Sequence, residues 1–171
     1  DAEGFATKYT YDAEGRQLSR TAFGGNALTV GDATTIAQID GMVNGAPTIT
    51  VSNTYDNAGR ILTITDGEGY ITRNSYNALG QLVDVAVAHG TSAQVTTRYT
   101  YDQAARILTQ TSAYGTSDAA TVTYAYDGLG NRTSVTDARG NIATYTYDHI
   151  GRLLTATDAL GGVTTYVYDA F

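Results

Sequence analysis

The chain has 171 residues, with 14 Tyr and 19 Gly, a single Pro, no Cys and a formal net charge of −7. The lack of Cys excludes disulfides and thiol catalysis, and so acidic a chain lacks the basic surface that nucleic acid binding requires. No stretch approaches the roughly 18 consecutive apolar residues of a membrane span, so we expect no membrane insertion. Frequent Tyr and Gly favour strands joined by tight turns.

A Tyr followed by Asp or Asn recurs along the chain. The intervals between successive copies are 44, 21, 25, 25, 21 and 21 residues, which indicates a repeat of about 21 residues with insertions. The residue after the Tyr is Asp in every copy except one, where it is Asn77. The copies are Tyr11-Asp12, Tyr55-Asp56, Tyr76-Asn77, Tyr101-Asp102, Tyr126-Asp127, Tyr147-Asp148 and Tyr168-Asp169.

Each repeat carries two Gly positions that predict turns. The order Asp-x-x-Gly suits a type I turn in which Gly takes the left-handed conformation and closes a bulged hairpin. This first-turn position holds Gly15, Gly59, Gly80, Gly130 and Gly151, with Ala105 as the exception. The second position, fourteen residues after the Tyr, holds Gly25, Gly69, Gly90, Gly115, Gly140 and Gly161. The pattern therefore predicts an all-β fold of antiparallel β-hairpin repeats with two strands each.

Three segments follow from this alignment, within a single repeat array. Residues 1–25 start the first repeat, and Gly4 fits the second turn of a preceding one. Residues 26–54 form an irregular insertion or a degenerate repeat, with an extra hairpin about Asp40-Gly41 and a loop or edge at Pro47. Residues 55–171 form the regular repeats. Because Ala105 stands where positive φ is favoured, which costs about 1 kcal/mol relative to Gly, we expect a distorted turn there.

The spacing of the Tyr residues within strands predicts aromatic ladders. Pairs such as Tyr145 and Tyr147 are two residues apart and share a strand face. Stacked hairpins would align these rings, and each cross-strand contact would contribute about 0.2 to 1 kcal/mol. Apolar residues occupy both faces, as Leu153 and Leu154 show, so alternation does not decide which face lies inside.

An Arg follows the first-turn position in most repeats and should face the Asp of its own turn. Such pairs are worth about 0 to 1 kcal/mol when exposed, so they set register more than stability. Asn77 and Gln81 replace both charges together in one repeat. The expected pairs are Asp12 with Arg16, Asp56 with Arg60, Asp102 with Arg106, and Asp148 with Arg152.

No group of residues predicts a catalytic, cofactor or metal site. His89 and His149 each stand at a turn and have no Cys, Glu or second His at metal spacing. Repeated turn aspartates suggest Ca²⁺, but Asp-x-x-Gly is also what a turn without metal requires. Acidic neighbours such as Asp66 with Glu68 are interpreted as solvated turn residues rather than a glycosidase pair. We therefore expect no enzyme activity.

The pattern YDxxGRLxxxTDxxGxxxxYxYD resembles the YD repeat of the RHS family, which includes bacterial RHS proteins, shell components of insecticidal toxin complexes, and teneurins. The resemblance covers residues 1–25 and 55–171, and Tyr147 to Gly161 follows the pattern closely. It implies a spiralling ribbon, a β-solenoid-like shell segment that can enclose a toxic polypeptide. The chain shows no "DPxG"-type core motif, so self-cleavage is not implied. Because both termini fall within turns, we expect a part of a longer protein.

The function that this reading favours is a structural scaffold, part of a shell that encapsulates or displays a polypeptide in a larger secreted or surface protein. The expected partners are adjacent repeats of the same longer chain, identical copies, or a polypeptide cargo. The alternative is an extracellular adhesion module or a self-assembling filament, with carbohydrate binding through Tyr faces as a further option.

Overall fold

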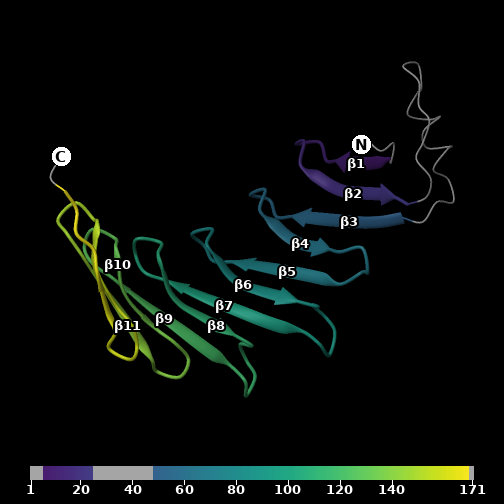
Figure 1. Cartoon of the computed structure of the whole chain (residues 1–171). Coiled ribbons are helices and arrows are strands. Elements are labelled where there is room, and N and C mark those ends of the chain that lie inside the picture. Colours follow the sequence, from purple (N-terminus) through teal and green to yellow (C-terminus); the bar gives the residue numbers. More distant parts are fainter. Residues whose placement is uncertain (1–5, 25–47, 170–171) are drawn as a thin grey trace. The chain divides into compact units, whose positions relative to one another are not determined.

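The computed structural model describes residues 6–24 and 48–169, and it confirms the all-β prediction (Figure 1). Within these ranges there is no helix of the length and apolar character that a membrane span requires. The expectations for Gly4, Gly25, the Asp40-Gly41 hairpin and Pro47 lie outside the described residues. The strands are β1 (Thr7–Tyr11), β2 (Gln17–Phe23), β3 (Thr48–Tyr55), β4 (Ile61–Thr65), β5 (Ile71–Tyr76), β6 (Leu82–Val87), β7 (Val95–Tyr101), β8 (Ile107–Ser112), β9 (Ala120–Tyr126), β10 (Arg132–Thr136), β11 (Ile142–Tyr147), β12 (Leu153–Thr157) and β13 (Val163–Thr165).

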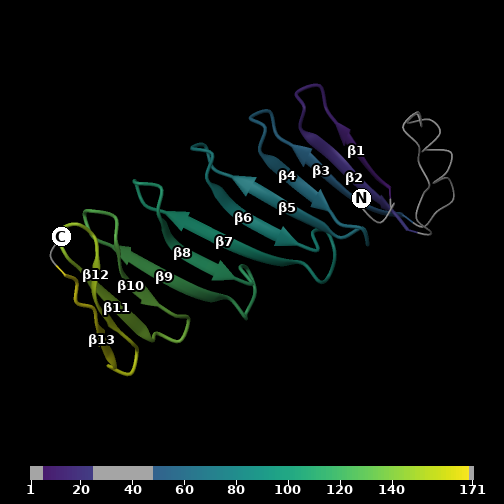
Figure 2. The same ribbon diagram turned by 45° about the horizontal axis from the view of Figure 1, so that its top comes forward.

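The described strands form one antiparallel sheet in which sequence order is also spatial order, from β1 to β13. The chain divides into two compact units, and each is described by itself. Unit 1 contains Asp1–Asn74 and Ala86–Gln94, and unit 2 contains Ser75–Val85 and Val95–Phe171. Strand β3 pairs with β2 from Thr48 to Ser52, so the regular pairing of unit 1 begins before Tyr55. Figure 2 shows the successive hairpins of each unit from a second direction.

A β-bulge follows the first turn of the hairpins whose register is described. In unit 2, Tyr147 lies opposite Leu153 while Thr146 lies opposite Thr155, so Leu154 has no partner of its own. The extra residue shifts the alternation of side chains by one position. The bulge explains why apolar residues stand next to each other at this point of the repeat. The corresponding unpaired residues are Leu18, Leu62, Leu108 and Thr133.

The bulge separates two chemically different faces in unit 2. On one, the tyrosine face, cross-strand partners include Tyr124 with Val135 and Tyr145 with Ala156. On the other, the threonine face, hydroxyl groups pair across strands, and Thr146 Oγ1 lies 2.7 Å from Thr155 Oγ1. The same hydroxyl pairs join Thr100 to Thr109 and Thr111 to Thr121 in unit 2, and Thr10 to Ser19, Thr21 to Thr50 and Thr54 to Thr63 in unit 1.

The first turns have the same geometry whether or not they contain Gly. Ala105 has a φ of 64°, which agrees with the expected positive φ. The expected distortion is wrong, because the Ala105 amide donates to the Asp102 carbonyl at 3.1 Å and the Asp102 amide donates to the Arg106 carbonyl at 2.9 Å. The Gly59 turn has the same two bonds, at 3.0 and 2.9 Å. The hydrogen bonds of the turn therefore hold Ala in the left-handed conformation.

The 25-residue repeats differ from the 21-residue repeats in their second turn. The sequence Ala-x-Gly-Thr-Ser occurs at 88–92 and again at 113–117. In each copy the Thr hydroxyl donates to the carbonyl of the first Ala at 2.8 Å, and the Thr amide donates to it at 3.2 Å. The two Ala residues, Ala88 and Ala113, have positive φ values of 51° and 49°. The inserted residues therefore build a wider turn and leave the strand pairing in register.

The sheet is a single layer with almost no core. Among the described residues, Ala86 is the one apolar side chain that is buried, at 8% exposed. Strands in ordinary domains bury one face against a second layer. The free energy that holds these strands together therefore comes from the hydrogen-bonded ladders, the turns and side-chain contacts along the sheet.

Replacing Ala105 with Gly tests the strain at the exceptional turn. Because Gly adopts positive φ without steric cost, we expect Ala105→Gly to raise the free energy of unfolding by up to about 1 kcal/mol. Its neighbour Ala104 lies outside the left-handed region, so Ala104→Gly should lower stability by roughly 0.5 to 1 kcal/mol through unfolded-state entropy. Urea unfolding followed by circular dichroism measures both, and equal losses for the two variants would contradict the interpretation.

Candidate functional site

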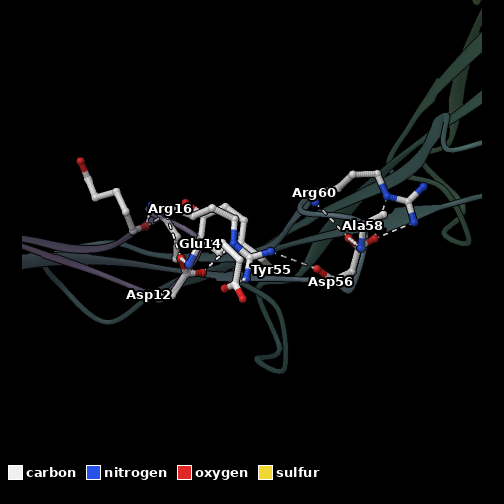
Figure 3. Close-up of polar contacts among 9 residues, drawn as sticks. Asp12, Glu14, Arg16, Tyr55, Asp56, Ala58 and Arg60 are labelled. Atoms are coloured by element: carbon white, nitrogen blue, oxygen red, sulfur yellow. Dashed lines mark hydrogen bonds and ion pairs between the residues drawn. The ribbon is translucent and has the colours of Figure 1, made fainter.

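The first turns are organised by the Asp side chain. In unit 1, Asp56 Oδ1 accepts hydrogen bonds from the backbone amides of Ala58 and Arg60, both at 2.9 Å (Figure 3). The Asp12 turn repeats this pattern, with amide bonds of 3.1 Å from Glu14 and 2.8 Å from Arg16. A short acceptor side chain in this position satisfies amides that would otherwise need water.

The structure contains all four of the Asp–Arg pairs that the sequence predicts. The Arg guanidinium reaches the second carboxylate oxygen of the turn Asp at 2.6 to 2.7 Å, and the Asp side chains are between 12% and 17% exposed. The pairs are Arg16 with Asp12, Arg60 with Asp56, Arg106 with Asp102, and Arg152 with Asp148. In the repeat that lacks both charges, Asn77 Nδ2 donates to Gln81 Oε1 at 2.6 Å. This uncharged hydrogen bond takes the place of the Asp–Arg pair across the first turn.

The hydrogen bonds in the turn keep the Asp side chains ionised. The backbone amide of Arg60, followed by its guanidinium, lowers the pKa of Asp56 below 3.8. The amide of Arg106 has the same effect on the pKa of Asp102. For Asp127, the side-chain amide of Asn131 is the main cause of a lowered pKa. Burial raises the pKa of Asp148, but the bonds from Arg152 together outweigh it and the net direction is down.

In five of the described repeats, the Tyr before the turn Asp donates its hydroxyl to a carbonyl of the preceding hairpin. In unit 2, Tyr126 Oη donates to the carbonyl of Ile107 at 2.9 Å. The ladder between β8 and β9 ends at the pair of Thr109 and Thr123, so the Ile107 carbonyl lies beyond the last strand pair. A backbone carbonyl without a partner is costly, and the Tyr hydroxyl supplies the donor. The equivalent bonds are Tyr55 to Gln17, Tyr101 to Leu82, Tyr147 to Arg132 and Tyr168 to Leu153, at 2.6 to 2.9 Å.

The Arg of one turn also lies over the Tyr ring of the next hairpin. The guanidinium of Arg106 lies 4.6 Å from the centre of the Tyr126 ring, and Arg106 Nη1 donates to the Asp127 carbonyl at 3.1 Å. In unit 1, Arg16 lies 4.9 Å from the Tyr55 ring and reaches the Asp56 carbonyl at 3.5 Å (Figure 3). Each such Arg therefore connects its own turn to the following one.

The sequence predicts Tyr rings packed on one another, whereas the described contacts place Arg over Tyr. In unit 2, the Arg132 guanidinium lies 5.8 Å from the centre of the Tyr124 ring and 5.5 Å from the centre of the Tyr145 ring. A cation over a ring contributes about 0.5 to 1 kcal/mol at exposed sites. We call the Tyr hydroxyl bond together with the Arg–ring contact the inter-hairpin contact.

The Gly of the first turn leaves space for the preceding hairpin as well as adopting positive φ. At Gly151, with φ of 84°, a Cβ would lie 3.2 Å from Asn131 Oδ1. At Gly130, a Cβ would lie 3.6 Å from Arg106 Nη1. The residue that follows one first-turn position, Gly130 or Ala105, therefore lies against the Gly of the next first turn.

The remaining predicted repeat residues take corresponding places in the sheet. Tyr11 ends β1 and is 58% exposed, and Tyr76 ends β5. Gly15 and Gly80 have positive φ values of 79° and 82°. Their role in holding repeats together remains a prediction.

One charged group on the threonine face was not predicted from the sequence. Arg98 forms a bidentate pair with Asp84, at 2.7 and 2.8 Å, and lies 3.8 Å from the Tyr114 ring. The group occurs where the wider second turn brings Tyr114 over β7. Tyr114 is the second residue of the Ala-x-Gly-Thr-Ser sequence, and His89 takes that position in the other copy.

The residues considered for chemistry are occupied by turn contacts or exposed. His89 contacts Arg73 at 3.4 Å and Gln94 at 3.0 Å in its turn. Asp66 Oδ1 accepts the amides of Glu68 and Tyr70 at 3.0 and 2.9 Å. His149 is exposed in the turn after β11. In residues 6–24 and 48–169, no group of three or more His, Asp or Glu is arranged to hold a metal ion.

Removing one Tyr hydroxyl tests the inter-hairpin contact. We expect Tyr126→Phe to lower the free energy of unfolding by about 1 kcal/mol or more, because the Ile107 carbonyl loses its donor. Tyr124→Phe is the matched control, since the described contact of Tyr124 is made by its ring with Arg132. Urea unfolding of the two variants distinguishes them, and equal stabilities would show that the hydroxyl bond contributes nothing.

The lowered pKa values predict a loss of stability in acid. A carboxyl group whose pKa is lower in the folded chain stabilises the fold fully above its unfolded-state pKa, near 3.8 for Asp56 and Asp102. This stabilisation disappears as the pH falls through the folded-state pKa. We therefore expect the urea midpoint to decrease below about pH 4.

The chain supplies its own neutral control for this acid dependence. Replacing Asp102 with Asn and Arg106 with Gln reproduces the natural pair of Asn77 and Gln81. This variant should lose less stability than the wild type between about pH 4 and pH 2, whatever its stability at neutral pH. Identical acid profiles would exclude a contribution from the Asp102 carboxylate.

Comparisons with known proteins agree with this arrangement of repeats. The family model described as RHS Repeat matches residues 55–92, 118–142, 126–163 and 147–171. No curated protein sequence matches the chain.

Solved structures that match part of the chain include the crystal structure of TcdB2-TccC3, at 23% identity and a TM-score of 0.45 over 87% of this chain. A structure of the Photorhabdus luminescens Tc holotoxin pore matches at 23% identity and a TM-score of 0.46 over 91%. The chain spans 9% of the length of each of these proteins. Because the family model matches more than half of the residues, the chain belongs to the RHS repeat family.

Proposed function

We propose that this chain is a non-enzymatic structural scaffold, a ribbon of YD repeats that forms part of a shell. The shell would encapsulate or display another polypeptide in a larger secreted or surface protein. The observation that carries the proposal is the inter-hairpin contact, which joins neighbouring hairpins through Arg16 and Tyr55 in unit 1, and through Arg106 and Tyr126 and Arg152 and Tyr168 in unit 2. A repeated connection of this kind suits an extended wall.

The distribution of side chains supports a wall rather than a globular active site. Catalysis needs several groups that converge on one substrate position. Here four of the first turns each contain one Asp–Arg pair, and the carboxylate of each pair accepts backbone amides from the same turn. These polar groups therefore form contacts within their own turn and with the neighbouring hairpin.

The Tyr contacts also bear on the carbohydrate alternative. Sugar binding by stacking needs an open aromatic face. In the described contacts, Arg106 lies over the Tyr126 ring and Arg152 lies over the Tyr168 ring, both at 4.6 Å. These contacts favour a role for the rings in joining hairpins.

Protease protection in the full-length protein that carries this segment tests the proposal. We expect an enclosed polypeptide to be cleaved at least about tenfold more slowly than the same polypeptide alone. Weakening one inter-hairpin contact with Arg106→Ala and Tyr126→Phe should increase its cleavage rate, because the wall opens locally.

Arg139→Ala is the matched control for the loss of a positive charge. Its amide donates to Asp137 Oδ1 within a second turn, outside the described inter-hairpin contacts, so protection should persist. Equal cleavage of the polypeptide with and without the segment would contradict encapsulation. A hydrolase activity that disappears on replacing a turn Asp, in a variant that still folds, would contradict the scaffold assignment.

A further inference from the structure

In unit 2, the wider second turn holds an Arg between a ring and a carboxylate. The Tyr114 amide donates to the Thr96 carbonyl at 2.8 Å, and the Arg98 guanidinium lies 3.8 Å from the centre of the Tyr114 ring. Arg98 Nε and Nη2 donate to the two carboxylate oxygens of Asp84 at 2.7 and 2.8 Å. A planar guanidinium matches a carboxylate in this two-bond geometry. The carboxylate therefore satisfies the Nε–Nη2 edge of this Arg.

In unit 1, the equivalent turn also brings a ring beside an Arg. The His89 amide donates to the Ile71 carbonyl at 2.8 Å, and His89 Nε2 lies 3.4 Å from Arg73 Nη1. Arg73 stands two residues after Ile71, as Arg98 stands two residues after Thr96. The two Arg side chains therefore occupy equivalent positions in their repeats, and each can be compared with the other.

Thr63 takes the place of the carboxylate beside Arg73. Both Thr63 and Asp84 stand eight residues after the Tyr of their repeat. Thr63 lies directly opposite Arg73 in the register of β4 with β5. Its hydroxyl is uncharged and lies 2.7 Å from Thr54 Oγ1. In the described part of the chain, no ion pair includes Arg73.

His89 contacts Arg73 through Nη1, the nitrogen that Arg98 does not use for its carboxylate. Gln94 Oε1 accepts the Gly90 amide at 3.0 Å, so His89 Nδ1, which lies 3.0 Å from the same oxygen, must donate to it. His89 Nε2 then accepts from Arg73 Nη1. Among the described residues, the Nε–Nη2 edge of Arg73 has no acceptor, and the Arg73 side chain is exposed.

We propose that Arg73, Thr63 and His89 form a binding site for a carboxylate group of another polypeptide, and we call it the Arg73 site. The carboxylate lies on the Nε–Nη2 edge of Arg73, in the position that Asp84 takes beside Arg98. His89 holds Nη1 and leaves that edge to the ligand. The ligand class follows from unit 2, where the same edge binds a carboxylate. An Asp or Glu side chain supplies this group, whether or not its polypeptide is enclosed by a shell.

Titration of the isotope-labelled chain with sodium acetate tests the proposal, with the Arg73 Nε–H signal in NMR spectra as the readout. We expect a saturable shift of this signal and weak affinity, in roughly the millimolar range or above, because the site is exposed. Sodium chloride at the same ionic strength is the control for screening. An equal shift with chloride, or no saturable shift with acetate, would overturn the proposal.

Two reciprocal variants exchange the paired and the unpaired Arg. Thr63→Asp should supply an internal carboxylate to Arg73 and weaken acetate binding by roughly fivefold or more. Asp84→Thr should free the same edge of Arg98, so that the Arg98 Nε–H signal gains a response to acetate that the wild type lacks. Thr63→Ser is the matched control and should bind acetate as the wild type does, and circular dichroism reports whether each variant keeps the β fold. Unchanged acetate binding in a folded Thr63→Asp variant would contradict the proposed position of the ligand.

A short peptide that contains Glu, and its counterpart with Gln in place of Glu, test the polypeptide as the source of the carboxylate. The Glu peptide should shift the Arg73 signal and the backbone amide signals of Thr63 and His89, and the Gln peptide should not. Arg73→Gln should abolish the response of those amides. Arg139→Gln, which removes a positive charge from a second turn, should leave it unchanged. Binding of acetate without binding of the Glu peptide would exclude a polypeptide ligand and overturn the proposal.

Discussion

The hydrogen bond from a Tyr hydroxyl to a backbone carbonyl is the contact on which the repeat depends. The strand ladder between two hairpins stops before the bulge, and the next carbonyl would lack a donor. Tyr126 supplies that donor for Ile107, and Arg106 lies over the Tyr ring. One side-chain pair thus completes the backbone bonding and connects adjacent turns. The two anchor residues have separate tasks, since Tyr joins hairpins while Asp closes its own turn.

The bulge is the second constraint, because it gives the sheet two different faces. Leu154 has no partner across the strand pair, so the alternation shifts by one residue after each first turn. Tyr and the aliphatic residues then gather on one face, and Thr hydroxyl pairs form on the other. Because of that shift, alternation in the sequence alone could not assign the adjacent Leu153 and Leu154 to faces.

The sequence was sufficient to predict the all-β hairpin repeat, the turn positions and the Asp–Arg pairs, because each depends on residues close in sequence. It did not predict the Tyr–carbonyl bond or the Arg–Tyr contact, since these depend on how one hairpin lies against the next. The prediction of a distorted turn at Ala105 was wrong, because the hydrogen bonds of this turn hold Ala105 at a φ of 64°. Asp84, Arg98 and Tyr114 form a group found once among the described residues, so periodicity carried no signal for it.

Because almost no side chains are buried, a destabilising substitution in this protein should affect mainly the hairpins next to it. In a domain with a shared core, a single poor substitution loosens contacts throughout. Here Ala86 is the one buried apolar residue among those described, and the stabilising groups act between immediate neighbours. Folding cooperativity should therefore be short-ranged, as in other linear repeat proteins. A chain of this kind can tolerate wide variation in individual repeats while the rest of the sheet persists.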